Sequence, residues 1–424
     1  MHQRTSRRAF LGCAAALAAS ATIARPAIAQ SAPRVVVVGG GFAGVSAART
    51  LKRLDPRIAV TLIEANQTFI ACPFSNGVIA GLRDLKEQQF GYDKVAAEGI
   101  TVTIAAAEAV DTAKREVTLA GEQRLTYDRL VLAPGIDLNW TALPGYDEAA
   151  TEQMPHAWKA GAQTLLLRRQ LEAMADGGVV IIAAPANPYR CPPGPYERAS
   201  LIAYYLKTKK PRSKLIVLDA KDAFSKQRLF QSAWAELYPD IIEWVSLSKG
   251  GKVTSVDVAN KTLATDFGSH KADVANVIPP QKAARIAAVA GVADRTGWCP
   301  IDPVTFESKL QPNIHVLGDA TIAGGMPKSA FTANAQAKVC ATAVAKMLRG
   351  ETPAEPKLIN TCYSLVAPDY GINVAGVYRP VNGVLTEIEG SGGVSATDAP
   401  RAARALESTY ANGWFNTITS EVFG

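Results

Sequence analysis

The chain has 424 residues, of which 48% are hydrophobic and 20% are charged, and its formal net charge is +7. This length is sufficient for two or three domains with sizeable cores. Four of the positive charges are arginines of an N-terminal leader, which leaves about +3, too mild a charge to favour nucleic-acid binding. No later apolar run approaches the length of a bilayer span, so no transmembrane segment is predicted.

The N-terminus has the pattern of an export signal. Residues 6–12 read SRRAFLG, an alanine-rich apolar stretch follows, and small residues at 27–29 suit a cleavage site. We interpret residues 1–29 as a twin-arginine signal peptide and expect the protein in the periplasm. The alternative is a chance arginine pair in front of a general secretory peptide. Five cysteines follow the leader, so at least one of them lies outside any internal disulfide.

The most informative motif directly follows the leader. Residues 35–44 read VVVVGGGFAG, a β-branched run that leads into Gly39, Gly41 and Gly44 at the spacing GxGxxG. A second apolar run at 59–63 then ends in Glu64. In a dinucleotide-binding βαβ unit, the glycines allow the tight turn, the approach of the pyrophosphate and close helix packing, while the acid binds the ribose. The alternative is a glycine-rich turn without a ligand.

A second βαβ unit is predicted further along the chain, and it lacks this motif. Residues 178–185 read as a buried parallel strand, residues 200–207 as a short helix, and residues 214–219 as the next strand. The loop at 183–195 contains prolines where glycines would be needed to approach a phosphate. This unit therefore resembles a nicotinamide-binding domain that has lost its nicotinamide.

The chain then returns to the first unit. Residues 313–319 read as a strand that ends in Gly318-Asp319, and a helix is predicted from Pro327 to about Leu348. The predicted class is α/β, with two Rossmann-like dinucleotide-binding domains and a C-terminal α+β interface domain. The expected boundaries are 31–145 with 285–350 for an FAD-binding domain, 146–284 for the degenerate NAD-like domain, and 351–424 for the interface domain.

Five short segments together carry a family resemblance. They are residues 69–76 (FIACPFSN), 189–198 (YRCPPGPYER), 297–302 (GWCPID), 318–319 (GD) and 360–364 (NTCYS). With them, the mature chain resembles the flavoprotein subunit of flavocytochrome c sulfide dehydrogenase, within the wider group of glutathione-reductase-like and sulfide:quinone-oxidoreductase-like flavoproteins.

The resemblance implies FAD as the cofactor. Gly39, Gly41, Gly44 and Glu64 would hold its adenosine half, and Asp319 would bind the ribityl chain. The helix from Pro327 would direct its N-terminal N–H groups at the flavin pyrimidine, where Lys328 could add positive charge. Cys72 would form a thioether to the flavin 8α-methyl group. From the residues alone, a cysteine before a proline on a loop is more often a structural thiol.

The resemblance also implies the chemistry. Cys191 and Cys362 would be a redox-active pair that oxidises sulfide or polysulfide, and Glu197 would handle protons; a plain structural disulfide or two unrelated thiols is the alternative. Core packing is favoured for Cys299 and Cys340, and no metal site is predicted. The chain has no CxxCH haem motif, so any c-type haem would belong to a partner. The resemblance implies a c-type cytochrome subunit as a heterodimer partner, docked near the flavin and the C-terminal segment.

Two rival functions remain open at this stage. A sulfide:quinone oxidoreductase would carry apolar or amphipathic C-terminal helices for the bilayer surface, whereas residues 412–424 are mixed and short and residues 389–410 are largely polar or small. A flavin-binding electron carrier without sulfide turnover is the second rival, and sulfide-dependent reduction of cytochrome c separates it from the enzyme.

Overall fold

The protein is described by a computed structural model that covers residues 32–424, so the predicted leader lies outside the described residues. One sheet of five parallel strands, in the order β20-β9-β1-β2-β5, carries the glycine motif. The four valines of β1 are buried, as expected for a strand covered on both faces. The strands are β1 (Arg34–Val38), β2 (Ala59–Glu64), β5 (Thr101–Ile104), β9 (Arg129–Leu132) and β20 (Ile314–Val316).

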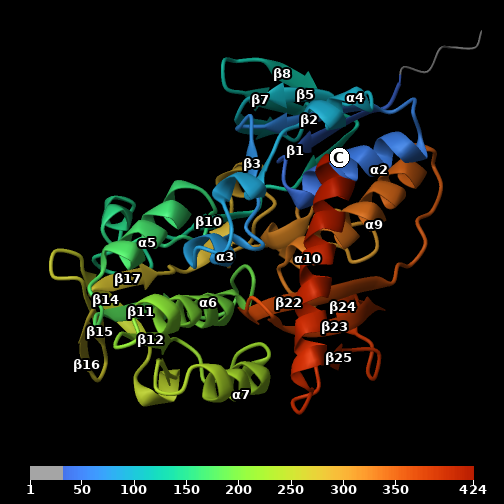
Figure 1. Ribbon diagram of the computed structural model, residues 1–424. Helices are drawn as coiled ribbons and strands as arrows, with labels where there is room; N and C mark the ends of the chain where they lie inside the picture. Colours follow the sequence, from blue (N-terminus) through green and yellow to red (C-terminus); the bar gives the residue numbers. More distant parts are fainter. Residues whose placement is uncertain (1–31) are drawn as a thin grey trace, which may run out of the picture. The chain divides into compact units, whose positions relative to one another are not determined.

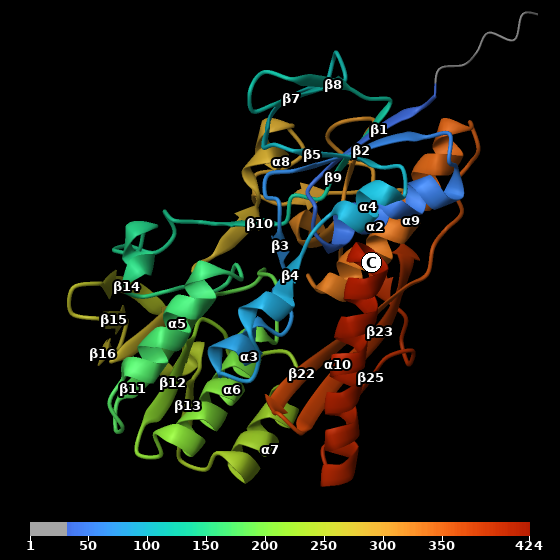
Figure 2. The same ribbon diagram turned by 45° about the horizontal axis from the view of Figure 1, so that its top comes forward.

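Two helices lie side by side against this sheet, α2 (Phe42–Leu54) and α9 (Ala330–Leu348) (Figures 1 and 2). Helix α9 ends where predicted, but it begins three residues after the predicted start at Pro327. The reason is Ser329, whose hydroxyl accepts a hydrogen bond from the N–H of Thr332 at 3.1 Å and caps the helix. Because β20 and α9 come late in the chain, the first domain is built from two distant segments.

The second parallel sheet has the order β13-β12-β11-β17, and a helix, α6, joins β11 to β12. Helix α6 begins six residues before the predicted start at Ser200, since Pro195 fits its first turn. The elements are α5 (Ala162–Ala173), β11 (Val179–Ala184), α6 (Gly194–Lys209), β12 (Lys214–Asp219), α7 (Gln227–Leu237), β13 (Ile242–Val245) and β17 (Val274–Val277). Both predicted Rossmann-like units are therefore present, and the predicted α/β fold class is confirmed.

The C-terminal segment forms an antiparallel sheet with one long helix across it. The strands are β22 (Leu358–Ala367), β23 (Tyr370–Val381), β24 (Val384–Glu387) and β25 (Gly393–Val394), and the helix is α10 (Arg401–Phe423). The interpretation of this tail as short and mixed is wrong, because α10 has 23 residues. Helix α10 lies against β22, β23 and α2 (Figure 2). The chain itself therefore covers the apolar stripe of Phe415, Ile418, Val422 and Phe423, while Leu406 and Tyr410 are exposed.

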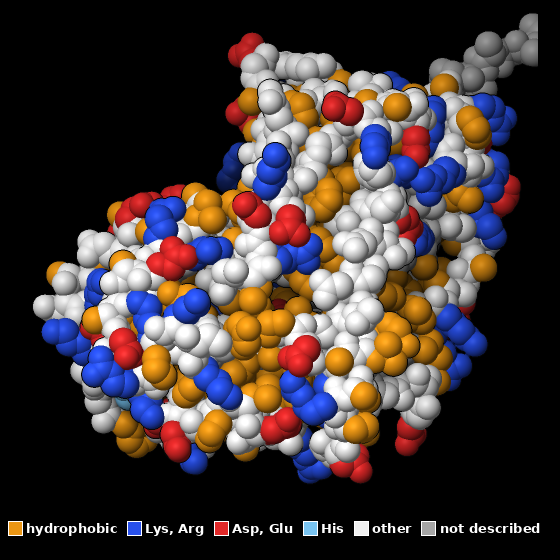
Figure 3. Space-filling model, in the orientation of Figure 1, with side chains coloured by type: hydrophobic (Ala, Val, Ile, Leu, Met, Phe, Trp, Pro, Cys, Tyr) orange, Lys and Arg blue, Asp and Glu red, His pale blue; other side chains and the backbone are white. Residues whose placement is uncertain are grey.

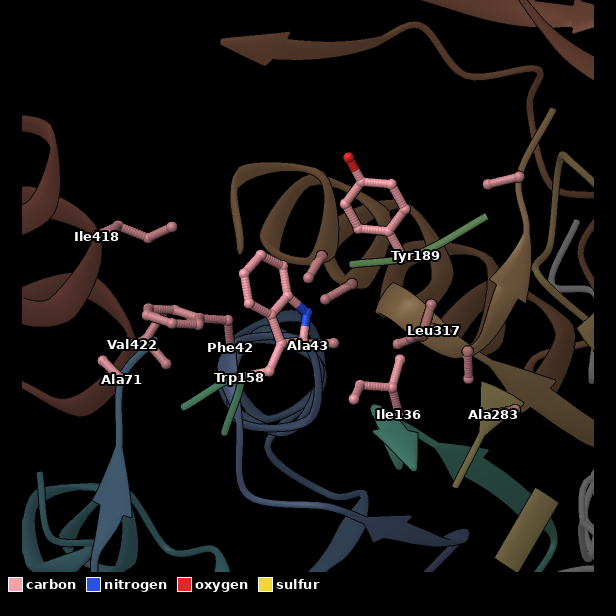
Figure 4. Close-up of a cluster of buried hydrophobic side chains, with 14 of the residues drawn as sticks. Phe42, Ala43, Ala71, Ile136, Trp158, Tyr189, Ala283, Leu317, Ile418 and Val422 are labelled. Carbon is pink, nitrogen blue, oxygen red and sulfur yellow. The ribbon is translucent and has the colours of Figure 1, made fainter. Parts of the chain in front are cut away.

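The main core runs through all three parts. Figure 4 shows side chains of this core from all three parts, among them Phe42 and Ala43 of α2, Trp158, Tyr189, and Ile418 and Val422 of α10. Smaller elements complete the structure: β3 (Phe69–Ile70), α3 (Ser75–Ile79), β4 (Gln89–Phe90), α4 (Asp93–Ala97), β6 (Ala107–Asp111), β7 (Glu116–Leu119), β8 (Arg124–Thr126), β10 (Ile136–Leu138), β14 (Val253–Asp257), β15 (Thr262–Thr265), β16 (Gly268–Lys271), β18 (Gln281–Ala283), α8 (Arg285–Val289), β19 (Cys299–Pro300) and β21 (Thr321–Ile322).

Candidate functional site

A cavity of about 560 Å³ lies where the first sheet, the loop before α6, strand β22 and helix α10 meet. Hydrophobic side chains gather in the middle of the face shown in Figure 3, between the segments labelled α3, α6 and α10 in Figure 1. Eight of the ten predicted site residues line the cavity: Gly39, Gly41, Glu64, Cys72, Cys191, Glu197, Asp319 and Cys362. A ninth, Gly44, lies in the first turn of α2.

The glycine loop has the geometry that a pyrophosphate requires. Gly39 has φ +106°, and a Cβ there would lie 2.3 Å from the carbonyl oxygen of Ala133. A Cβ on Gly44 would lie 1.8 Å from the carbonyl oxygen of Gly39, so only glycine lets α2 approach β1 this closely. Glu64 accepts a hydrogen bond from the N–H of Gly40 at 2.7 Å and faces the cavity from the end of β2. These features fit the adenosine diphosphate half of a dinucleotide.

Asp319 follows β20 and contributes an unpartnered acceptor. Its Oδ1 is buried and has no hydrogen-bond partner among the described residues. Burial raises the pKa of this carboxyl, while the charges of Arg190 and Lys328 lower it. An orphaned buried oxygen that faces a cavity needs a donor, and a ribityl hydroxyl of FAD would supply one.

Lys328 does not line the cavity. Its ammonium donates to the carbonyl oxygens of Asp319 at 2.8 Å and Thr321 at 2.6 Å, and it lies 3.9 Å from the ring centroid of Trp298. Burial lowers its pKa to about 8. The ammonium of Lys328 therefore holds the Asp319 loop, and its effect on the flavin stays a prediction.

Cys72 precedes a left-handed turn that starts helix α3. Phe74 has φ 66°, and the N–H of Ser75 donates to the carbonyl oxygen of Cys72 at 3.0 Å. The sulfur lies 3.8 Å from the carbonyl oxygen of Trp158 and is exposed to the cavity. This turn places the thiol on the wall of the cavity that Cys191 also lines.

Cys191 and Cys362 line the same cavity as separate thiols. Cys191 has φ 57°, and its N–H donates to the carbonyl oxygen of Lys328 at 2.8 Å. A left-handed cysteine is held by its surroundings at some energetic cost, which is common at functional sites. Burial raises the pKa of Cys191 well above its ordinary value, and negative charge on Cys362 raises it further, so the two sulfurs influence each other. Cys299 and Cys340 are buried in the core.

Glu197 lies in the first turn of α6 beside this pair. Its carboxylate accepts hydrogen bonds from Asn76 Nδ2 and from the N–H of Leu365, both at 2.8 Å. Burial raises the pKa of this carboxyl, against the lowering effect of those two donors. A carboxyl with a raised pKa next to thiols is placed to exchange protons with them.

Three basic residues around the cavity were not predicted. Arg190 lines it and donates to the carbonyl oxygen of Trp158. Arg198 is 2% exposed and donates to Asn76 and to Asn276 at 3.0 and 2.9 Å. Both belong to the segment 189–198, so the arginines of this proline-rich segment could have been predicted from the sequence as cavity residues. Lys226 had no such signal, because only the fold brings it to β22.

In the second Rossmann-like unit, the acid at the end of β12 already has hydrogen-bond partners inside the protein. Asp219, fully buried at the end of β12, accepts from Tyr196 at 2.6 Å, Trp244 at 2.9 Å and Lys221 at 2.6 Å. In a functional dinucleotide unit, the acid at this position is free to bind a ribose. Here its acceptors are used inside the protein, consistent with the missing glycine motif.

The chain has two Rossmann-like units, and its cavity lies between the glycine loop of the first and the cysteine-bearing loop of the second. This arrangement defines a flavoprotein of the pyridine nucleotide-disulphide oxidoreductase class. Residues 33–181 match that family, described as "Pyridine nucleotide-disulphide oxidoreductase". Residues 164–279 match "Sulfide dehydrogenase (flavocytochrome c) flavoprotein chain, central", and residues 354–423 match "Flavocytochrome c sulphide dehydrogenase, flavin-binding".

Individual relatives agree with these matches. The sulfide dehydrogenase (flavocytochrome c) flavoprotein chain of Chlorobaculum thiosulfatiphilum is 62% identical over 45 residues, which cover 11% of this chain and 94% of that sequence. The sulfide-quinone reductase of Aquifex aeolicus is 24% identical over 382 residues, 84% of this chain and 87% of the relative. The solved sulfide:quinone oxidoreductase of Aquifex aeolicus has the same fold, with a TM-score of 0.72, 19% identity and 92% of each chain covered.

The chain belongs to the family of the flavoprotein chain of flavocytochrome c sulfide dehydrogenase. The predicted family is thereby confirmed, and the chain is a sulfide-oxidising flavoprotein oxidoreductase with FAD as its cofactor. Within residues 32–424, the search for a helix long and apolar enough to cross a membrane found none.

Proposed function

We propose that this chain oxidises hydrosulfide through a Cys191–Cys362 disulfide and passes the electrons through FAD to a c-type cytochrome subunit in the periplasm. The observation that carries the proposal is the single cavity that Cys72, Cys191, Glu197 and Cys362 share with the dinucleotide loop. The second unit has no glycine loop that could bind a nicotinamide dinucleotide. A reductant that reacts directly with a cysteine sulfur is therefore the better candidate for the substrate.

The first step is thiol–disulfide exchange. Hydrosulfide attacks one sulfur of the Cys191–Cys362 disulfide, the S–S bond breaks, and the other cysteine leaves as a thiolate with the electron pair. The attacked cysteine becomes a persulfide, so the sulfide sulfur is oxidised and the disulfide is reduced. Glu197 receives the proton that the persulfide loses, since its carboxyl lies next to the pair with a raised pKa.

Bound FAD would supply the redox chemistry of the next stage, since it can accept an electron pair and return it one electron at a time to a haem. The residues that would hold it are the glycine loop, Glu64 and Asp319, and the N–H groups at the start of α9 face the same cavity through Ser329 and Ala330. A helix N-terminus favours negative charge, so it would stabilise a cofactor that has gained electrons.

Cys72 is proposed to attach FAD covalently by a thioether. Its exposure to the cavity at the end of the β3 turn supports this role. Purified mature protein precipitated with acid should keep its yellow colour in the pellet, and Cys72→Ser should release the colour into the supernatant. Release from the unmodified protein would contradict the attachment and favour a quinone-linked enzyme.

The electron acceptor distinguishes the proposal from its main rival. A quinone-linked enzyme would need an apolar surface for the bilayer, whereas the apolar stripe of α10 is packed against β22, β23 and α2. A cytochrome partner is therefore favoured, and export by the twin-arginine route would place both subunits in the periplasm. Fractionation of cells that express the full chain checks this location.

Sulfide-dependent reduction tests the function directly. We expect sulfide to bleach the flavin and to support reduction of cytochrome c, while NADH does neither. Cys191→Ser should stay yellow and fail to bleach. If this variant bleaches at the normal rate, the cysteine pair is not the route; if the unmodified protein never bleaches with sulfide, the chain is an electron carrier without sulfide turnover.

A further inference from the structure

Lys226 occupies an unusual backbone position close to the cysteine pair. It directly precedes helix α7, with φ 61° and ψ 26° in the left-handed region, and its carbonyl oxygen accepts from the N–H of Phe230 at 3.1 Å. Glycine and asparagine adopt this conformation most readily, and a lysine does so at a cost. The position therefore calls for a reason beyond the local turn.

The side chain supplies that reason, because it crosses from the start of α7 to strand β22. Its ammonium donates to the carbonyl oxygen of Cys362 and to Ser364 Oγ, both at 2.8 Å. Both acceptors are neutral, and no carboxylate of residues 32–424 lies within 4.0 Å of this ammonium as an ion-pair partner. A partly buried cation is thus held on the backbone of a cysteine without a fixed counter-charge.

The groups that can balance this charge are the carboxyl of Glu197, on which Lys226 also acts, and the thiols themselves. Cys362 is faced by Lys226, by Glu197 of α6, by Cys191 of the loop before α6 and by Tyr378 of β23. Burial and the charge of Glu197 both raise the pKa of Cys362, and the charge of Lys226 opposes them. Lys226 and, more weakly, Arg190 lower the pKa of Cys191, and Lys226 is the cation of the described residues that acts on Cys362.

We propose that Lys226 is a positioning residue that holds the Cys362 strand in place and stabilises negative charge on the Cys362 sulfur. This role rests on the proposed function, in which breaking the disulfide leaves one cysteine as a thiolate that carries the electron pair. With Lys226 present, Cys362 can bear that charge inside a buried cavity; without it, the thiolate would have to take up a proton.

Thiol ionisation can be measured without sulfide or turnover. In the reduced protein with Cys191→Ser, Cys362 is the remaining cysteine of the pair, and peptide mass spectrometry follows its alkylation by iodoacetamide from pH 6 to pH 10. Adding Lys226→Met should move the midpoint of the alkylation rate upward by about one pH unit or more, which lowers the rate near pH 7 roughly tenfold. Lys226→Arg, which keeps the charge, should restore the original midpoint.

The outcomes separate the two levels of the proposal. An unchanged midpoint in Lys226→Met, with FAD content and melting temperature preserved, overturns the role of Lys226 and leaves sulfide oxidation standing. If the midpoint shifts but sulfide bleaches Cys191→Ser at the normal rate, the charge effect of Lys226 is supported. The proposed function on which it rests is then contradicted. A midpoint that shifts equally in Lys226→Arg assigns the effect to strand geometry and also overturns the charge role.

Discussion

His156 should make the folded protein sensitive to mild acid. The side chain is 6% exposed, and its Nδ1 accepts a hydrogen bond from the N–H of Trp158 at 2.8 Å, so the ring is held neutral. Burial, together with the positive charges of Arg198, Lys159 and Arg190, lowers its pKa to about 3. Protonation would place a charge among cations without a partner.

The size of this effect follows from the difference between the pKa of His156 in the unfolded chain and its pKa in the folded protein. In the unfolded chain the histidine binds a proton below its ordinary pKa of 6.5, whereas the folded protein does not until about pH 3. The unfolded state therefore holds more protons between these values, and stability falls as the pH falls through this window. At pH 5 the loss from His156 alone is about 2 kcal/mol, at 1.36 kcal/mol for each pH unit below 6.5.

His156→Asn isolates this contribution. An asparagine oxygen can accept from the N–H two residues on, as the histidine nitrogen does, but it does not titrate. Urea unfolding of both proteins at pH 7.5 and pH 5 should show that the unmodified protein loses about 2 kcal/mol more than the variant. Glu197, whose raised pKa gives a contribution lost as pH rises, is present in both proteins and cancels. Equal losses in the two proteins would refute the buried neutral histidine.

Three further predictions concern binding and stability. Gly44→Ala should abolish FAD binding, because the added Cβ would lie 1.8 Å from a backbone oxygen, whereas Gly91→Ala, with open space around it, should keep the normal flavin-to-protein ratio measured by absorbance. Arg198→Met should lower the free energy of unfolding in urea by at least about 3 kcal/mol, because several buried acceptors lose their donor; a loss below 1 kcal/mol would contradict this network. Asp219→Ala should cost about 3–5 kcal/mol by leaving the buried Lys221 unpaired, while sulfide-dependent bleaching of the folded fraction stays normal; loss of bleaching would assign that acid a functional role.

Local sequence patterns predicted much of the fold. The valine run, the GxGxxG spacing and Glu64 predict β1, α2 and β2, because strand burial and tight glycine turns are decided by near neighbours. The missing glycines of the loop at 183–195 likewise predict a degenerate second unit, and the buried contacts of Asp219 agree with it. The family followed from short motifs, and the comparisons confirm it.

Element ends and the C-terminal helix were harder to predict. The capping hydrogen bond of Ser329 decides where α9 starts, and a proline two residues earlier gave the wrong position. The 23 residues of α10 have few strong apolar repeats, so their pattern suggested a mixed tail. The helix is stabilised by packing against α2 and the C-terminal sheet, and such contacts leave no local signal.

The sequence by itself determined which chemistry the chain can perform: a dinucleotide loop, thiols and an acid are each specified by a few adjacent residues. Only the tertiary structure decided how these groups are charged and which of them meet. Lys226 and Cys362 are 136 positions apart, yet a left-handed turn and a strand place the ammonium on the carbonyl oxygen of the cysteine. The physical reason is that pKa values and hydrogen bonds depend on distance and burial in space, and these arise only when distant segments pack together.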